Sequence, residues 1–248
     1  APLPRPRLRD LSLKRATGFL NWHRSRKFRA TTASLERVLA DLRTRHPDHI
    51  AVTGDLANIG LPAELEAAAR WLDGLGPAAD VTVVPGNHDA YVHLLRDAGI
   101  GRWNAHMTAS SGMESLGAGA RFPFVRRIGE VALIGLSSAV PRPPLVASGR
   151  LGRRQCAALA RVLAELGRQG LARVVLIHHP PLPGTAKAWR GLEDAEAFVG
   201  VLAEHGAELV LHGHDHQSQY GEAAGPSGRP IPVVGVPSAS ATGAGHDA

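Results

Sequence analysis

The stretch VTVVPGNHDA, residues 81–90, contains the feature that decides the fold. A run of β-forming residues ends at a proline and a glycine, and Asn87, His88 and Asp89 follow in succession. Pro-Gly-Asn is common in turns, so a plain turn is one interpretation of this stretch. The other is a functional site, because all three side chains can bind metal or transfer protons. The remaining sequence has to decide between the two.

Apolar β-forming runs alternate with amphipathic stretches along the chain, which predicts an α/β fold with helices covering the faces of a sheet. A segment rich in glycine, serine and alanine, 108–120, is expected to form a loop. We expect strands over 49–53, 81–85, 131–136, 173–177, 208–212 and 231–236, and helices over 31–45, 62–74, 152–169 and 193–205.

Length and composition are those of one large domain. The chain has 248 residues, 44% of them hydrophobic, and no low-complexity linker divides it. The single cysteine, Cys156, excludes an intrachain disulfide and fits a reducing compartment, so we expect a cytoplasmic location. No apolar run approaches the roughly 20 residues of a membrane-spanning helix.

Positive charge is concentrated at the start of the chain. Residues 1–30 hold nine Lys/Arg and one acid, a net +8, which leaves −2 for the other residues of a chain with net charge +6. The remainder is therefore not a basic nucleic-acid-binding surface, and the basic segment 1–30 is a separate feature.

The basic segment has two interpretations. Leu8, Leu11, Phe19 and Trp22 would share one face of a helix with basic residues around them, which suits contact of residues 8–29 with an anionic membrane surface or an acidic substrate. The protein would then be membrane-peripheral.

Two residues favour the other interpretation, a helix or loop packed on the domain with solvated Arg and Lys side chains. Arg15 interrupts the apolar stripe, and Gly18 weakens the helix. The sequence leaves both interpretations open.

Polar side chains follow four of the expected strands. In open α/β sheets, ligands bind beyond the carboxyl ends of the strands. Four independent turns are unlikely to share this composition by chance, so we interpret the polar turn after 81–85 as part of a functional site. The first strand is followed by Asp55, the second by Asn87, His88 and Asp89, the fourth by His178 and His179, and the fifth by His214, Asp215 and His216.

These groups suit metal ions. Imidazole, carboxylate and amide oxygen ligands together fit Mn, Fe, Zn, Ni or Co. His214 and His216 are two residues apart and would point in different directions on an extended backbone, which suits two ions better than one. Asp55 has two carboxylate oxygens and can bridge them. Two ions that clamp a phosphoryl group and activate a water indicate phosphate ester hydrolysis.

Four motifs in this order resemble the calcineurin-like metallophosphoesterase superfamily: GDLAN (54–58), GNHD (86–89), HHPP (178–181) and GHDH (213–216). The resemblance extends from about residue 50 to about residue 240. It implies a four-layer αββα double-sheet sandwich, a single domain over 31–248, and hydrolysis by a hydroxide that bridges two divalent ions.

The resemblance also implies a role for each motif residue. Asp55 would bridge the two ions. Asn87, His178 and His214 would complete one metal site, and His216 would serve the other.

The remaining two motif residues would act on the substrate. His88 would lie over the phosphate, stabilising the transition state or protonating the leaving oxygen, and Asp89 would orient His88 through a hydrogen bond. Outside these roles, we expect His179 either to support a metal ligand or to be a plain packed or solvent-facing residue. We expect His212 to be structural and Asp215 to be an orienting or surface residue.

One family motif is missing. An Asp-x-His at the end of an opening strand should precede the basic segment, but the chain opens APLPRPRLRD and its only early aspartate, Asp10, has no histidine two residues later. We expect that the chain is cropped; the alternative is a member that has lost ligands for one ion.

The resemblance favours a bacterial-type phosphodiesterase over a monoesterase, acting on a small-molecule phosphoester. One alternative is a pyrophosphatase acting on a lipid-linked nucleotide sugar, which the basic segment would suit. The other is a non-catalytic scaffold of the same fold, against which the retained His88-Asp89 pair argues.

Overall fold

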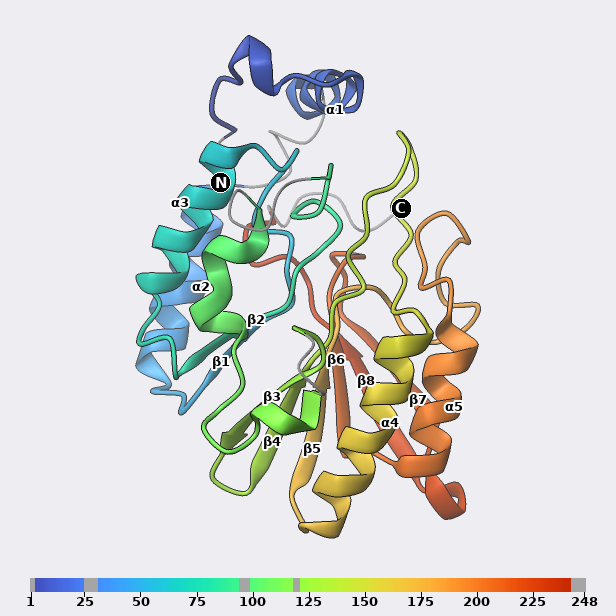
Figure 1. Ribbon diagram of the computed structural model, residues 1–248. Coiled ribbons are helices and arrows are strands. Elements are labelled where there is room, and N and C mark those ends of the chain that lie inside the picture. The colour runs from blue at the N-terminus through green and yellow to red at the C-terminus, as the bar shows by residue number, and fades with distance from the viewer. Residues whose placement is uncertain (1–2, 25–30, 94–98, 118–120, 242–248) are drawn as a thin grey trace.

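Two β-sheets pack face to face in the structure (Figure 1). The computed structural model describes residues 3–24, 31–93, 99–117 and 121–241. The smaller sheet pairs β1 (Ile50–Val52) with β2 (Val81–Val83) in parallel. The larger sheet has the order β3-β4-β5-β6-β8-β7, with parallel strands in the middle and an antiparallel strand at each edge. Its strands are β3 (Phe124–Ile128), β4 (Val131–Gly135), β5 (Ala172–Leu176), β6 (Leu209–His212), β7 (Gln219–Ala224) and β8 (Pro230–Gly235).

Helices cover the outer face of each sheet. The smaller sheet is flanked by α2 (Thr32–Thr44) and α3 (Pro62–Asp73), and the larger by α4 (Arg153–Arg168) and α5 (Ala195–His205) (Figure 1). This arrangement confirms the αββα sandwich. Short 3₁₀ helices span Leu8–Asp10, Ile100–Met107, Glu114–Gly117 and Pro226–Gly228.

Three apolar layers hold the four structural layers together, and strand alternation builds them. Along β5 and the residue after it, Val175 and Ile177 join the core under α4 and α5, whereas Leu176 points to the other face, between the sheets. A third cluster packs β2 against α3 and the Ile100–Met107 helix around the fully buried Trp103.

All six expected strands and all four expected helices form, with ends shifted by one or two residues. The two edge strands β3 and β7 were not predicted. Their sequences, FVRRI and QYGEAA, carry too many polar residues for an apolar-run criterion. In β3, the buried Arg126 donates to backbone carbonyls, among them those of Thr108 and Val81, which explains an arginine inside a strand.

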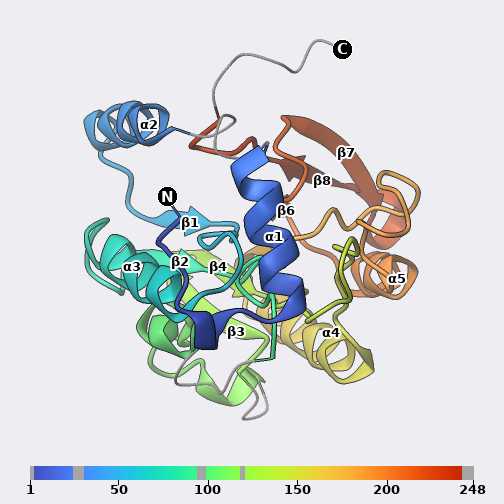
Figure 2. The same cartoon turned by 90° about the horizontal axis from the view of Figure 1, so that it is seen from above.

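The basic segment forms a helix with a different face from the one expected. Helix α1 (Leu13–Arg24) begins after Leu8 and Leu11, so these two do not share a helical face with Phe19 and Trp22. Arg15 does not interrupt an outward stripe but is buried against the domain. The rest of the basic segment, 25–30, lies outside the described residues. Seen from above, α1 crosses the carboxyl ends of the strands (Figure 2).

Two further expectations can be compared with the structure. The segment expected as a loop contains the Glu114–Gly117 turn of 3₁₀ helix, and 118–120 lies outside the described residues. Among the helices of the described ranges, none combines the length and the apolar content needed to cross a membrane.

The packing predicts a matched pair of stability changes on α4. Leu159 is fully buried in the core beneath this helix, so Leu159→Ala should lower the free energy of unfolding by about 2–5 kcal/mol. Arg161, two residues away, is exposed, and Arg161→Ala should change it by less than about 0.5 kcal/mol. Urea denaturation measures both, and equal effects would contradict the assigned core.

Candidate metal centre

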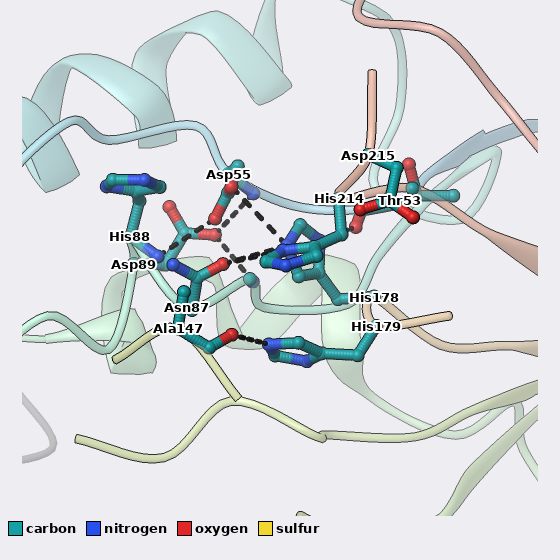
Figure 3. A network of polar contacts seen from close by, with 12 residues as sticks. Thr53, Asp55, Asn87, His88, Asp89, Ala147, His178, His179, His214 and Asp215 are labelled. Atoms are coloured by element: carbon teal, nitrogen blue, oxygen red, sulfur yellow. Dashed lines mark hydrogen bonds and ion pairs between the residues drawn. The ribbon is translucent and has the colours of Figure 1, made fainter. Parts of the chain in front are cut away.

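Four strand ends bring four metal-binding side chains together (Figure 3). Asp55 follows β1, Asn87 follows β2, His178 follows β5 and His214 follows β6. Asn87 Oδ1 lies 3.2 Å from His178 Nε2 and 3.0 Å from His214 Nδ1. The two imidazole nitrogens lie 3.2 Å apart, and Asp55 Oδ2 lies 3.4 Å from His178 Nε2.

The protonation of His178 tests whether this group fits a cation. Its Nδ1 lies 2.6 Å from the carbonyl oxygen of Thr53, which can only accept, so Nδ1 donates and carries the proton. In the neutral imidazole, Nε2 then presents a lone pair toward the oxygens of Asn87 and Asp55. Lone pairs that face one another in a buried site are stabilised by a positive charge between them, which a proton on Nε2 or a bound cation would supply.

The spacing also fits an ion. Ligand atoms about 2.1 Å from a tetrahedral centre are about 3.4 Å apart, and the four atoms here are separated by 3.0–3.4 Å in the contacts described above. The residues present therefore fit a divalent ion of the type expected from the sequence.

Electrostatics in the site already favour a charged carboxylate. Burial alone would raise the pKa of Asp55, but the neighbouring imidazoles of His178 and His88 hold that pKa well below its usual range. Burial lowers the pKa of His178, yet the adjacent Asp55 carboxylate raises it on balance. Burial and the charge of His178 lower the pKa of His214, which keeps that ring neutral. A neutral imidazole is the form that binds metal.

Unusual backbone conformations place these ligands. Asp55, His214 and His216 all have left-handed backbones, with φ of 60°, 71° and 59°. Non-glycine residues rarely adopt this conformation, and such residues cluster at functional sites. For Asp55 and His214, the left-handed turn lies within three residues of the strand end and belongs to the loop that carries the side chain into the site.

Gly86 allows the two loops of the smaller sheet to meet. A Cβ atom at this position would lie 2.1 Å from Asp55 Oδ1 and 2.7 Å from His178 Cε1. No side chain fits there without displacing Asp55, which explains the glycine at the start of GNHD.

Asp89 was expected to hydrogen-bond His88, but its described hydrogen bonds are with backbone groups. Its Oδ2 accepts hydrogen bonds from the backbone N–H groups of Asp55 and Gly86, each at 2.8 Å, and its Oδ1 accepts from Ala57 at 2.9 Å. The described bonds of this carboxylate thus join the two loops instead of orienting His88. Burial and the Asp55 charge raise the pKa of Asp89 to about 7, although the hydrogen bonds from Gly86 and Ala57 act to lower it.

His88 is held by a carbonyl group and an aromatic ring. Its Nδ1 lies 2.5 Å from the carbonyl oxygen of Asn58, so Nδ1 carries the proton in this contact. Its ring stacks on Tyr91, with centroids 5.7 Å apart and planes 11° apart. Its backbone N–H donates to Asp55 Oδ1 at 2.9 Å. In Figure 3 the His88 ring lies on the opposite side of Asp55 from His214.

Glu64 fixes the loop that carries Asn58. Its carboxylate accepts hydrogen bonds from the backbone N–H groups of Asn58 and Leu61 at 2.7 and 3.0 Å, and from Ile59 at 3.1 Å. The acidic residue in the first turn of α3 therefore stabilises both the helix and the loop that holds His88.

The other histidines of these motifs lie around the centre. His179 approaches it closely, but its Nδ1 is 2.7 Å from Ser138 Oγ and its Nε2 is 3.0 Å from the carbonyl oxygen of Ala147, so both nitrogens are engaged. Burial lowers the pKa of His179 to about 3. We therefore interpret His179 as a packed residue beside the group and not as a metal ligand.

The remaining motif residues lie near the surface or in the sheet. His212 is buried at the end of β6, and Asp215 pairs with Arg190 at 3.3 Å, a partner that the sequence did not indicate. His216 is exposed and is not part of the four-residue group. The structure thus brings together Asp55, Asn87, His178 and His214.

Comparison with known proteins shows which family this fold belongs to. Residues 22–218 match the calcineurin-like phosphoesterase family. The chain belongs to this family. The family is described as one of phosphoesterases, and among the described residues His178, His179 and His214 form a group that could hold a metal ion.

Two relatives illustrate the likeness. A probable cyclic nucleotide phosphodiesterase, syc0937_d, of Synechococcus sp. is 31% identical over 195 residues, covering 76% of this chain. The match spans 65% of that relative's own length. A dimetal phosphatase from Danio rerio superposes with a TM-score of 0.61 at 16% identity, over 84% of this chain and 78% of the other, and thus shares the fold.

The close contact at Gly86 predicts that Gly86→Ala weakens metal binding by about tenfold or more, because the new methyl group displaces Asp55. Isothermal titration with Mn²⁺ measures the affinity. Gly200→Ala is the matched control: no atom lies within 4 Å of its added Cβ, and it should leave the affinity unchanged. Equal affinities in the two variants would contradict the role given to Gly86.

Proposed function

We propose that this phosphoesterase hydrolyses a phosphodiester with the help of two divalent ions, each Mn, Fe, Zn, Ni or Co. The observation that carries the proposal is the convergence of Asp55, Asn87, His178 and His214, with acceptor atoms 3.0–3.4 Å apart. The relative described as a probable cyclic nucleotide phosphodiesterase supports a diester over a monoester.

The ligands divide between the two ions. Asn87, His178 and His214 would hold one ion, His216 would hold the other, and Asp55 would be shared. The left-handed backbones of His214 and His216 support this division, because each residue turns away from the strand direction separately. When bound, the ions neutralise charge on the phosphoryl oxygens and make a water more acidic.

His88 is the residue proposed to act on the substrate. As the oxygen of a water molecule forms its bond to phosphorus, the bond to the leaving oxygen breaks, and His88 would stabilise the charge or give that oxygen a proton. The contacts with Asn58 and Tyr91 hold its ring in one orientation before the substrate arrives. Asp89, which the sequence suggested as the orienting group, would act indirectly by keeping the Asp55 and Asn87 loops together.

Two alternatives predict different results from the same assays. A pyrophosphatase acting on a lipid-linked nucleotide sugar would cleave a nucleotide pyrophosphate diester better than a simple phosphodiester. A non-catalytic scaffold would cleave neither. The cytoplasmic location and the division of the chain at residue 30 stay predictions.

Metal content and turnover test the proposal together. Protein expressed from the whole gene and loaded with Mn²⁺ should contain close to two ions per chain and hydrolyse bis(p-nitrophenyl) phosphate. His88→Ala should leave metal content unchanged and lower turnover by about 10²–10⁴, because it removes a positioned acid–base group. Asn87→Ala should weaken metal binding, and added Mn²⁺ should partly restore activity.

His205→Ala serves as the control, because this residue lies at the far end of α5 from the centre and should change neither quantity. Occupancy that never exceeds one ion would exclude the dinuclear site. A metal-loaded protein that cleaves no phosphoester would favour the scaffold, and His88→Ala that loses metal but keeps turnover would reverse the division of roles within GNHD.

A further inference from the structure

Helix α1 buries a charged side chain and exposes apolar ones, the reverse of the usual arrangement on a surface helix. Arg15 is buried against the domain with only 6% of its surface exposed, whereas Leu13 and Leu20 are 79% and 54% exposed. The two leucines are seven residues apart and therefore lie on the same helical face, two turns from one another. Leu8, in the turn before α1, is 90% exposed. Leu8, Leu13 and Leu20 together are called the outer leucines below.

The inward face of α1 explains why the leucines face outward. Arg15 Nε donates to the carbonyl oxygen of Ile59 at 3.2 Å, and its guanidinium also contacts the carbonyl oxygen of Gly60. Lys14 Nζ donates to the carbonyl oxygen of Tyr91 at 2.7 Å and lies 4.2 Å from the centre of its ring. Polar anchors at two successive positions fix the rotation of the helix, so Leu13 and Leu20 are held away from the domain.

Basic residues surround the outer leucines. Arg7 and Arg9 flank Leu8, and Arg24 follows Leu20 by one helical turn; all three arginines are exposed. Asp10 is the only acidic residue among the first 30 of the sequence. An apolar stripe edged by cations is complementary to a surface with negative charge outside and hydrocarbon beneath.

Other exposed apolar side chains lie at the same end of the molecule as α1. Leu145 is 95% exposed and Trp189 is 48% exposed. Their loops are joined by a 2.8 Å hydrogen bond from Ala147 N–H to the carbonyl oxygen of Trp189, and the carbonyl of Ala147 contacts His179 beside the metal centre. The loops of Leu145 and Trp189 thus carry exposed apolar side chains near the metal centre. Helix α1 crosses the carboxyl ends of the strands at this end of the molecule (Figure 2).

We infer that the outer leucines and the arginines beside them bind the protein to an anionic membrane surface, with the metal centre facing the lipid headgroups. A protein partner would need a surface of matching shape, whereas a membrane engages apolar groups from separate loops at once. The binding itself does not depend on which phosphoester the enzyme cleaves.

Co-sedimentation with vesicles tests the inference on metal-loaded protein expressed from the whole gene. Vesicles of phosphatidylglycerol mixed with phosphatidylcholine should bind the protein, and vesicles of phosphatidylcholine alone should bind it much less. Raising the salt from about 0.1 M to about 1 M should release it, because the charge attraction is screened.

Two sets of substitutions separate the apolar from the charged part. Leu13→Ser with Leu20→Ser should weaken vesicle binding by about tenfold or more. Arg7→Gln, Arg9→Gln and Arg24→Gln together should weaken it by about 100-fold, at about fivefold for each arginine. The matched controls lie on α2: Val38→Ser, where the side chain is 47% exposed, and Arg37→Gln with Arg43→Gln should leave binding unchanged.

Three outcomes of the vesicle experiment would overturn the membrane-binding inference. Equal sedimentation of wild type and both variant sets, or equal binding to neutral and anionic vesicles, would overturn the inference. So would a change in oligomeric state caused by Leu13→Ser with Leu20→Ser and no change in vesicle binding, because it would assign the leucines to a second copy of the chain. Thermal unfolding confirms that each variant is folded. No substrate is present, so failure here leaves the phosphodiester proposal untouched.

Discussion

The buried carboxylate of Asp89 is the interaction on which the centre depends. It accepts backbone hydrogen bonds from Asp55, Ala57 and Gly86, and so joins the loops that follow the two strands of the smaller sheet. A sheet of two short strands has little other means of fixing its loops. Because Asp55 and Asn87 sit on these loops, their position opposite the histidines of the larger sheet follows from this one carboxylate. Removing it would leave buried N–H groups unsatisfied in both loops.

The close approach of the strand ends of the two sheets is the second constraint on the site. The two sheets contribute the proposed metal ligands from opposite sides, so these side chains meet only if the strand ends nearly touch. Gly86 permits this contact, and the left-handed backbones of Asp55 and His214 turn the side chains inward. The resulting group of acceptor atoms is unfavourable without a cation. The favourable free energy of folding the sandwich therefore offsets the cost of holding these acceptor atoms close together.

The sequence was most informative where chemistry is local. Each polar motif follows an apolar strand directly, so the region of the site could be predicted from the strand ends. The choice of Asp55, Asn87, His178 and His214 as metal ligands came from the family resemblance. The partners of Asp89 could not be predicted, because its hydrogen bonds come from backbone groups, which have no sequence signature. The edge strand β3 was missed because its buried arginine, Arg126, donates to carbonyl groups that are distant in sequence. The face of α1 was assigned wrongly, because Arg15 finds its partners in the loop at Ile59 and Gly60.

The central claim is that Asp55, Asn87, His178 and His214 share one divalent ion. Anomalous X-ray diffraction at the manganese edge, on crystals of the protein grown with Mn²⁺, tests it most directly. We predict an anomalous peak within about 2.0–2.3 Å of Asp55 Oδ2, Asn87 Oδ1, His178 Nε2 and His214 Nδ1. A peak bound instead through His179, or no peak among these four atoms at saturating Mn²⁺, would contradict the account.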